Sequence, residues 1–208
     1  MQFHIFISVI ITFLFMKIAM GLRVEGQKNI PREGGVIIAP NHLSNWDPPI
    51  IGTSAALRRE VFFLAKQELF SSNKFYSLLL SKYNTIPIKR YGIDKKSIRA
   101  STFHLKRGRT LVIFLEGKRS IEKSFLKPLP GVGYLALKTG VGIVPTYIEG
   151  SAESIIDLIR KRKRVLVRFG KIIDVSKLNT KGSLPERSRA LSKLVMKEIM
   201  SLGKRCLR

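Results

Sequence analysis

Residues 35–49 of this chain read Gly-Val-Ile-Ile-Ala-Pro-Asn-His-Leu-Ser-Asn-Trp-Asp-Pro-Pro. The apolar run at its start predicts a buried strand, and the polar residues after it predict a loop that leads into a helix. In α/β proteins, ligand sites lie where such strands end. His42 and Asp47 stand at this place. A histidine can take a proton from an alcohol, and a carboxylate on its other ring nitrogen orients the ring, so the pair is interpreted as a general base with its orienter.

The same residues have a structural interpretation that the spacing alone leaves open. Asp47 precedes two prolines, which suits the N-cap of a helix over residues 48–57. His42 would then be a turn residue bonded to the backbone. Trp46, inside the loop, is expected to pack in the core rather than to lie at a membrane interface.

A second polar motif follows another apolar run. Residues 110–113 predict a buried strand, and residues 114–120 continue it as Phe-Leu-Glu-Gly-Lys-Arg-Ser. Arginine matches a phosphate with two parallel hydrogen bonds, lysine adds a point charge, and glycine lets the backbone approach closely. The motif therefore predicts an anion site at a strand end, and a solvated basic loop is the alternative.

Together these motifs resemble the glycerolipid acyltransferase family, the 1-acylglycerol-3-phosphate acyltransferases in particular. The resemblance covers about residues 22–150, and its blocks stand in the family's order. The blocks are Asn41-His42 with Asp47, Ile86-Pro87-Ile88-Lys89-Arg90, Glu116-Gly117-Lys118-Arg119-Ser120 and Gly142-Ile143-Val144-Pro145. Three positions depart from the family pattern: Leu115 replaces a proline, Lys118 a threonine and Lys89 an acid.

The resemblance implies a role for each block. His42 would deprotonate the acceptor hydroxyl and Asp47 would support it. The acceptor phosphate would be held by Arg90 and by residues 116–119, that is Glu116, Gly117, Lys118 and Arg119, with Lys89 adding charge. The implied reaction moves an acyl chain from acyl-CoA or acyl carrier protein to the free hydroxyl of lysophosphatidic acid, giving phosphatidic acid. The same chemistry on glycerol-3-phosphate or another lysophospholipid is the near alternative. No cofactor is expected beyond the thioester co-substrate.

The charge of the chain requires an anionic partner. Lys and Arg number 38 against 14 Asp and Glu, a formal net charge of +24. Both nucleic acid and an anionic membrane surface fit such a balance. Residues 1–21 favour the membrane because residues 5–16 are almost unbroken apolar sequence, and they predict an anchor helix that spans the bilayer or lies in its interface. A cleavable signal peptide is the alternative, although a basic n-region is missing.

The location expected for the chain is the cytoplasmic face of the cell membrane, because segments rich in Lys and Arg resist translocation. A non-catalytic membrane- or nucleic-acid-binding module is the alternative from another class. It gives no reason for both polar motifs to stand at strand ends, and no RNA-binding aromatic signature is present, so no nucleic acid partner is expected. Three histidines and a single cysteine show no metal-ligand spacing, so no metal site is expected either.

The rest of the chain predicts an α/β fold with a mostly parallel central sheet flanked by helices. Residues 22–208 would form one acyltransferase domain after the anchor. Expected strands cover residues 22–24, 36–39, 61–65, 85–88, 110–114, 143–148 and 165–169, and expected helices cover 48–57, 74–82, 95–107, 133–138, 152–160 and 185–200.

Overall fold

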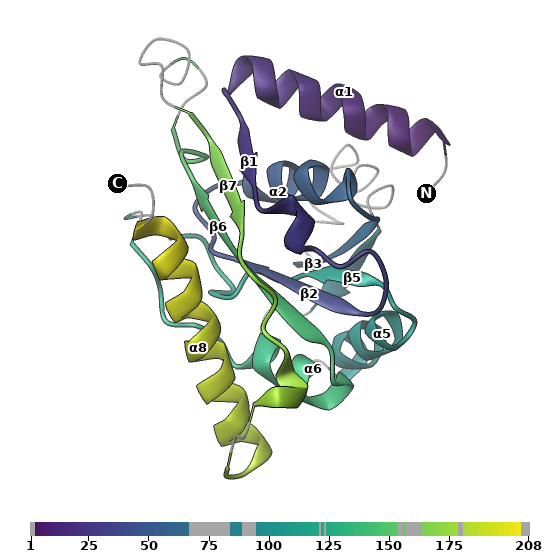
Figure 1. The fold of residues 1–208 in the computed structure, drawn as a ribbon, viewed down its shortest axis with the longest axis vertical. Coiled ribbons are helices and arrows are strands. Elements are labelled where there is room, and N and C mark those ends of the chain that lie inside the picture. The colour runs from purple at the N-terminus through teal and green to yellow at the C-terminus, as the bar shows by residue number, and fades with distance from the viewer. Residues whose placement is uncertain are drawn as a thin grey trace.

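The computed structural model of the protein describes residues 3–66, 84–88, 95–120, 122, 124–153, 156, 164–178 and 181–204. In these residues seven strands form one sheet in the order β1-β7-β6-β2-β5-β3-β4 (Figure 1). The strands are β1 (Arg23–Glu25), β2 (Val36–Pro40), β3 (Val61–Lys66), β4 (Thr85–Ile88), β5 (Thr110–Val112), β6 (Gly142–Glu149) and β7 (Leu166–Phe169). All neighbouring strands are parallel except β6 and β7, which are antiparallel.

Strand β2 lies at the centre of the sheet. All five of its residues are buried, as expected for a parallel strand covered on both faces. It pairs with β5 through Val36 and Thr110 and with β6 through Val36 and Gly142. The carboxyl end of β2 therefore lies between the segments that leave β5 and β6. The candidate site is located at this edge of the sheet.

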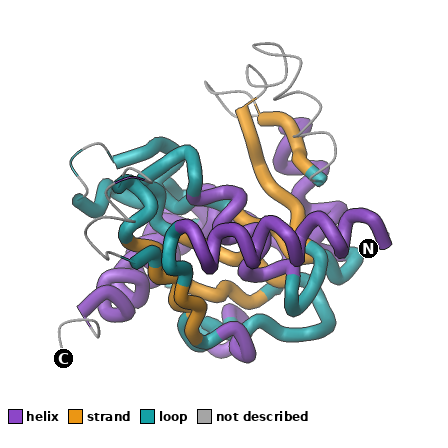
Figure 2. The backbone as a smooth tube through the Cα atoms, turned by 90° about the horizontal axis from the view of Figure 1, so that it is seen from above, coloured by secondary structure: helices purple, strands orange, loops and turns teal. Residues whose placement is uncertain are grey.

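Helices cover both faces of the sheet (Figures 1 and 2). They are α1 (Phe3–Ala19), α2 (Asp47–Ala56), α5 (Lys95–Lys106), α6 (Gly131–Thr139) and α8 (Leu184–Lys204), with short 3-10 helices η1 (Gln27–Asn29) and η2 (Val175–Lys177). Side chains of α1 and α2 pack with Val36 and Ile38 on one face of β2. Side chains of α5, α6 and α8 pack with Ile37 and Ala39 on the other face.

The structure confirms the predicted fold class and most of its elements. Each expected strand is present, and expected helices at 48–57, 95–107, 133–138 and 185–200 correspond to α2, α5, α6 and α8. The strand expected to reach residue 114 ends at Val112, but Ile113 and Leu115 still donate backbone hydrogen bonds to β2. The expected helix at 74–82 lies outside the described residues, and the one at 152–160 lies almost entirely outside them.

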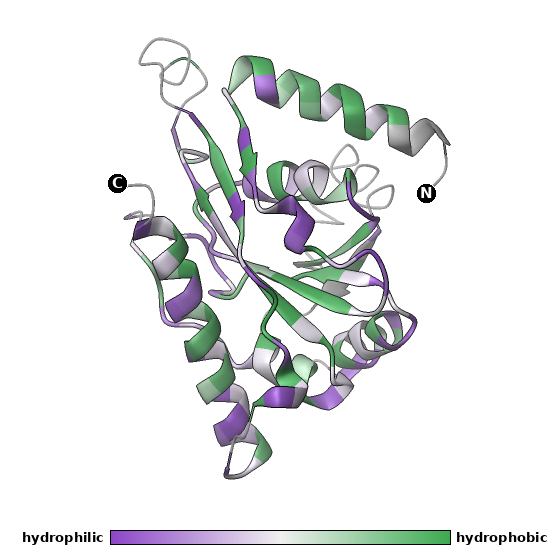
Figure 3. Cartoon of the chain, in the orientation of Figure 1, coloured by the Kyte–Doolittle hydropathy of each residue, from purple (hydrophilic) through white to green (hydrophobic). Residues whose placement is uncertain are grey.

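The N-terminal helix α1 packs against the domain through one of its faces. Val9, Met16 and Met20, the last just beyond the helix, are at most 4% exposed, and the two methionines belong to the core shared with α2. Figure 3 shows that α1 is apolar along most of its length. Among the residues described, no helix combines the length and apolarity needed to cross a membrane. Of the two anchor geometries considered, the structure therefore does not support the spanning one.

Candidate active site

Asn41 fixes the chain at the carboxyl end of β2. Its buried side-chain amide donates to the carbonyl of Ile148 at 3.0 Å and accepts from the N–H of Ile148 at 2.9 Å. These two bonds extend the pairing of β2 with β6 beyond the last strand residue. His42 follows directly, so its backbone position is set by the sheet at the edge where α/β proteins bind ligands.

His42 and Asp47 form the hydrogen bond that the sequence predicts. The Nδ1 atom of His42 lies 2.7 Å from Oδ2 of Asp47, and the two side chains are 16% and 0% exposed. The same carboxylate oxygen accepts the N–H groups of Leu43 at 2.6 Å and Ser44 at 2.8 Å. Because an ionised carboxylate can only accept, this contact assigns the proton to Nδ1. The Nε2 atom is then the basic nitrogen, available to a substrate hydroxyl.

The N-cap interpretation of Asp47 does not describe this structure. Helix α2 begins at Asp47 itself, its N-cap position is Trp46, and no side chain caps the helix. The carboxylate of Asp47 instead turns back toward the loop that carries His42. Pro48 and Pro49 follow in the first turn, where a missing N–H costs little, so the turn leaves this carboxylate free for the histidine.

A stacked aromatic ring holds the plane of the imidazole. The ring centroids of His42 and Phe114 are 4.0 Å apart, with an angle of 24° between the planes. Phe114 comes from the segment that leaves β5, so neighbouring strands position both rings. With Nδ1 bonded and one ring face covered, the imidazole has a defined orientation.

Glu116 joins the two polar motifs through the backbone. It is 3% exposed, its Oε1 accepts the N–H of His42 at 3.3 Å, and its Oε2 accepts the N–H of Leu126 at 3.2 Å. Burial raises the pKa of the Glu116 carboxyl, and the two backbone hydrogen bonds oppose that shift. The N–H of Ser120 also donates to the carbonyl of His42 at 2.8 Å. Residues of the second motif therefore bind both the N–H and the carbonyl group of His42.

Two exposed cations lie in the short loop between these anchor points. Lys118 and Arg119 are exposed, and Glu116 and Ser120, which stand on either side of residues 117–119, both bond to the backbone of His42. Gly117 makes the turn possible because its φ is +68°, and a Cβ at this position would clash with the side chain of Leu129. The arrangement combines a base, its orienting acid and two cations that an anionic substrate can reach, at one sheet edge.

The acyltransferase family model matches residues 21–149, which include β1 to β6 and both polar motifs. The chain belongs to the acyltransferase family. The resemblance seen in the sequence is therefore confirmed at the level of the family.

Relatives of this acyltransferase share most of its length. A 1-acyl-sn-glycerol-3-phosphate acyltransferase of Bacillus subtilis is 29% identical over 178 residues, which cover 84% of this chain and 86% of the relative. A protein of the same name from Streptococcus pneumoniae is 27% identical over 187 residues, covering 87% and 67%. The crystal structure of the 1-acyl-sn-glycerophosphate acyltransferase PlsC from Thermotoga maritima matches with a TM-score of 0.68 and 24% identity, covering 94% of this chain and 79% of that one. At this identity the structural match shows the fold alone.

The predicted site residues of the acyltransferase fall into two groups. His42, Asp47, Glu116, Gly117, Lys118 and Arg119 meet at the carboxyl end of β2. Lys89 and Arg90 lie outside the described residues and follow β4, which ends at Ile88. The expectation that Trp46 packs in the core is wrong: its side chain is 42% exposed because the loop turns it outward at the start of α2.

Sequence reasoning gave no role to Asn41 or Phe114. Asn41 precedes the catalytic candidate in the motif, but its partner lies 107 positions away. Phe114 stands at the end of an expected strand and at the start of the second motif, and the sequence assigns its ring no role. An aromatic residue at the end of the strand next to β2 is a signal that could have indicated the stacking.

Proposed function

We propose that this acyltransferase transfers an acyl chain from a thioester to the free hydroxyl of lysophosphatidic acid, giving phosphatidic acid for phospholipid synthesis. The proposal is carried by the 2.7 Å contact between Nδ1 of His42 and Asp47, which leaves Nε2 as a base beside exposed cations. The names of the relatives from B. subtilis and S. pneumoniae support the choice of acceptor.

The chain supplies a base for this reaction and no covalent nucleophile is needed. Nε2 of His42 takes the proton of the acceptor hydroxyl as its oxygen bonds to the thioester carbonyl carbon. Asp47 stabilises the imidazolium that forms, as the acid does in a catalytic triad. Collapse of the tetrahedral intermediate breaks the carbon–sulfur bond, and the departing thiolate takes the proton from Nε2. No cofactor beyond the thioester enters these steps.

Lys118 and Arg119 are proposed to bind the acceptor phosphate, together with Arg90 and Lys89. Arginine and phosphate form paired charge-assisted hydrogen bonds, whereas lysine acts as a point charge. Glu116 is assigned a different role, because both of its oxygens already accept backbone N–H groups. It positions the loop, and Gly117 allows the turn that brings the cations beside His42.

Helix α1 is proposed to hold the enzyme in the interface of the membrane on its cytoplasmic side. Its outward face exposes large apolar side chains at intervals of three or four residues, in contrast to the buried face with Met16. These side chains are Ile7, Ile11, Leu14, Phe15 and Ile18, between 42% and 85% exposed. An apolar stripe on the surface of a chain with net charge +24 suits an anionic bilayer surface, where the lipid acceptor resides.

The reaction is tested by supplying purified full-length protein with a labelled acyl thioester and a panel of acceptors. The panel contains lysophosphatidic acid, glycerol-3-phosphate, a lysophospholipid with a larger head group, and a lysolipid without phosphate. We expect labelled phosphatidic acid as the main product. Faster acylation of glycerol-3-phosphate would show that the acceptor is different while the chemistry is as proposed. If none of the acceptors gives a labelled lipid, the proposed function is refuted.

A further inference from the structure

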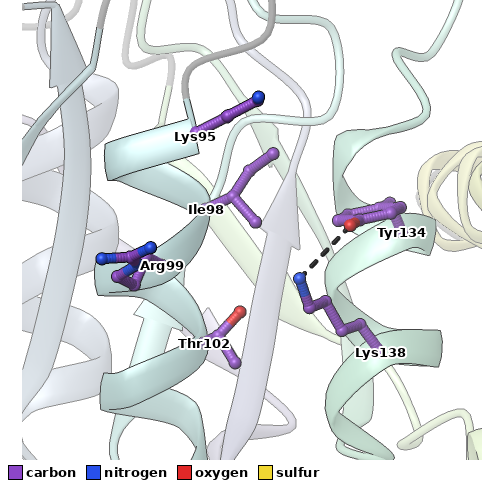
Figure 4. Close-up of a pocket in the computed structure, with 6 residues that line it drawn as sticks. All are labelled: Lys95, Ile98, Arg99, Thr102, Tyr134 and Lys138. Carbon is purple, nitrogen blue, oxygen red and sulfur yellow. Dashed lines mark hydrogen bonds between the residues drawn. The ribbon is translucent and has the colours of Figure 1, made fainter.

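A cationic groove lies between α5 and α6 (Figure 4), and His42 is not among its lining residues. Its volume is about 370 Å³. Its lining combines three cations with an aliphatic side chain, an aromatic ring and two hydroxyl groups. The lining residues are Lys95, Ile98, Arg99, Thr102, Tyr134 and Lys138.

The cations of the groove are not neutralised within the described chain. None of the ion pairs found among the described residues involves Lys95, Arg99 or Lys138. Lys138 instead donates to the hydroxyl of Tyr134 at 3.3 Å, as the dashed line in Figure 4 shows. The hydroxyl oxygen of Thr102 is covered and has no hydrogen-bond partner in the described part of the chain. The groove therefore offers positive charge to an anionic partner.

The groove begins at the sheet edge that carries the active site. Helix α5 starts after β4, and α6 starts after the loop that leaves β5, so both helices have their N-termini at the carboxyl edge of these strands. Lys95 and Ile98 belong to the first turn of α5, and Tyr134 lies near the start of α6. Just before α6, Leu129 donates a hydrogen bond to Leu115, next to Glu116. A partner in the groove thus lies on the same side of the sheet edge as His42.

The groove does not face the membrane surface proposed for α1. Helices α5 and α6 pack on one face of the sheet, and α1 with α2 packs on the other (Figure 1). A bilayer that receives the exposed face of α1 is therefore separated from the groove by the sheet. An anion that binds the cations of the groove therefore arrives from the aqueous side.

The positive charge extends well beyond one phosphate. Helix α5 has 12 residues, among them Lys95, Lys96, Arg99 and Lys106, and none of them is acidic. Its length is about 18 Å at the usual rise per residue. The phosphates of a nucleotide need cations that converge on one point, whereas the positive charge of α5 continues outside the groove lining to Lys96 and Lys106. An acidic protein surface fits this distribution better than a nucleotide does, and one of its apolar side chains can contact Ile98 and Tyr134.

We propose that the groove between α5 and α6 is the docking site for an acidic carrier protein that delivers the acyl thioester. The inference rests on the proposed function, because it names the partner that supplies the acyl chain to His42. The carrier itself contacts the cationic helices, and the thioester that it bears has to reach His42 at the sheet edge. Charge complementarity of this kind speeds encounter and selects the partner.

The test compares two donors on three full-length proteins: wild type, Arg99→Glu/Lys138→Glu, and the control Lys193→Glu/Lys197→Glu. The control reverses two exposed cations of α8 and changes the net charge equally. We expect the groove variant to raise the KM for an acylated acyl carrier protein about tenfold or more, with less than about a twofold change for acyl-CoA and for lysophosphatidic acid. The control should match wild type with every substrate.

Direct titration of labelled carrier protein separates this inference from the proposed function. If carrier binding weakens in the groove variant but no protein acylates lysophosphatidic acid, the docking site stands and the proposed function fails. An unchanged carrier KM, an equal rise for acyl-CoA, or a wild type that uses acyl-CoA alone overturns the docking site and leaves the proposed function intact. If the Glu variant misfolds, Arg99→Gln/Lys138→Gln removes the same two charges. An unaltered affinity of this variant for the carrier would also overturn the docking site.

Discussion

At the residue scale, the carboxylate of Asp47 uses one oxygen for all of its hydrogen bonds. Oδ2 accepts from His42, Leu43 and Ser44, while Oδ1 is buried without a partner in the described part of the chain. An asparagine at this position can keep the same three bonds through its carbonyl oxygen. It loses the negative charge that is proposed to stabilise the imidazolium.

Asp47→Asn should therefore fold normally and turn over slowly. We expect kcat to fall by about 10²-fold or more, with the acceptor KM little changed, because the base can no longer be stabilised once it is charged. Steady-state rates and circular dichroism measure both effects. Asn45→Ala, an exposed loop variant two residues away, is the matched control. A near-normal kcat in folded Asp47→Asn would show that the charge is not used.

Arg119 should affect binding of the acceptor and not the rate of chemistry. Loss of a charge-assisted hydrogen bond costs about 1.5–3 kcal/mol, so Arg119→Ala is expected to raise the KM for lysophosphatidic acid about tenfold or more. The KM for the acyl donor should stay constant. Lys127→Ala removes an exposed cation farther along the same loop and serves as control. An equal effect on an acceptor without phosphate would assign Arg119 to the fold.

Local spacing predicted the contact between His42 and Asp47, because five positions across a strand-to-helix turn bring the two side chains together. It also placed Glu116 at the neighbouring strand end, but not its function as an acceptor for two backbone N–H groups. The latter depends on how the loops after β2 and β5 fold over one another. The prediction that Trp46 packs in the core was wrong for the same reason, because the conformation of a loop decides its exposure.

At the scale of elements, α1 has two apolar faces with different surroundings. Met16 and Met20 belong to the core, so deleting the N-terminal residues would disturb the fold as well as any membrane contact. Substitution of the outward face avoids this problem. Ile11 and Ile18 are 62% and 85% exposed and pack against little of the described chain.

Ile11→Glu/Ile18→Glu is expected to weaken binding to anionic vesicles while leaving catalysis on a short-chain, soluble acceptor unchanged. Residual binding should disappear as salt rises, because it then rests on Lys and Arg alone, about 1 kcal/mol each before screening. Vesicle co-sedimentation across salt concentrations measures it. Ile172→Glu adds charge at an exposed isoleucine beyond β7 and is the control. Unaltered binding of the double variant at high salt would refute the interfacial assignment of α1.

Helix α5 carries a histidine that should make stability depend on pH. Nδ1 of His104 accepts from Arg109 at 3.0 Å, and its ring lies 4.6 Å from that of Phe62. Burial lowers the pKa of His104 below its ordinary 6.5, and the charges of Arg109 and Arg107 add to the effect. In the window below about pH 6.5 the unfolded chain therefore binds more protons than the folded one, so acidification destabilises the fold through this group.

His104→Gln removes this titration. When the pH falls from about 8 to about 5.5, the free energy of unfolding should decrease more in wild type than in the variant. Urea unfolding at both pH values gives the difference. A gap between the two proteins that does not change with pH would show that His104 titrates alike in both states.

The elements themselves were predictable because the strands are short apolar runs and the helices lie between them. Their arrangement was not. The sheet order does not follow the order of the strands in the sequence, and the apolar run of β7 does not reveal that this strand is antiparallel to β6. The apolar run in α1 likewise could not reveal that one face packs on α2, since core and lipid select the same side chains.

At the scale of the whole molecule, the sheet separates two surfaces that are proposed to serve different substrates. The α1 face suits the lipid acceptor, the groove between α5 and α6 suits the carrier of the acyl chain, and His42 lies at the edge where both meet. Net charge +24 favours both anionic partners, but only their positions on opposite faces tell them apart.

The most direct test of this scheme is the initial rate of phosphatidic acid formation by full-length wild type and His42→Ala. Both receive the same labelled acyl thioester and lysophosphatidic acid vesicles, and circular dichroism and vesicle binding are compared in parallel. We predict that wild type forms phosphatidic acid and that His42→Ala is slower by about 10²–10⁴-fold, with fold and vesicle binding unchanged. Phosphatidic acid formation at a near-normal rate by folded His42→Ala would contradict the assignment of His42 as the base.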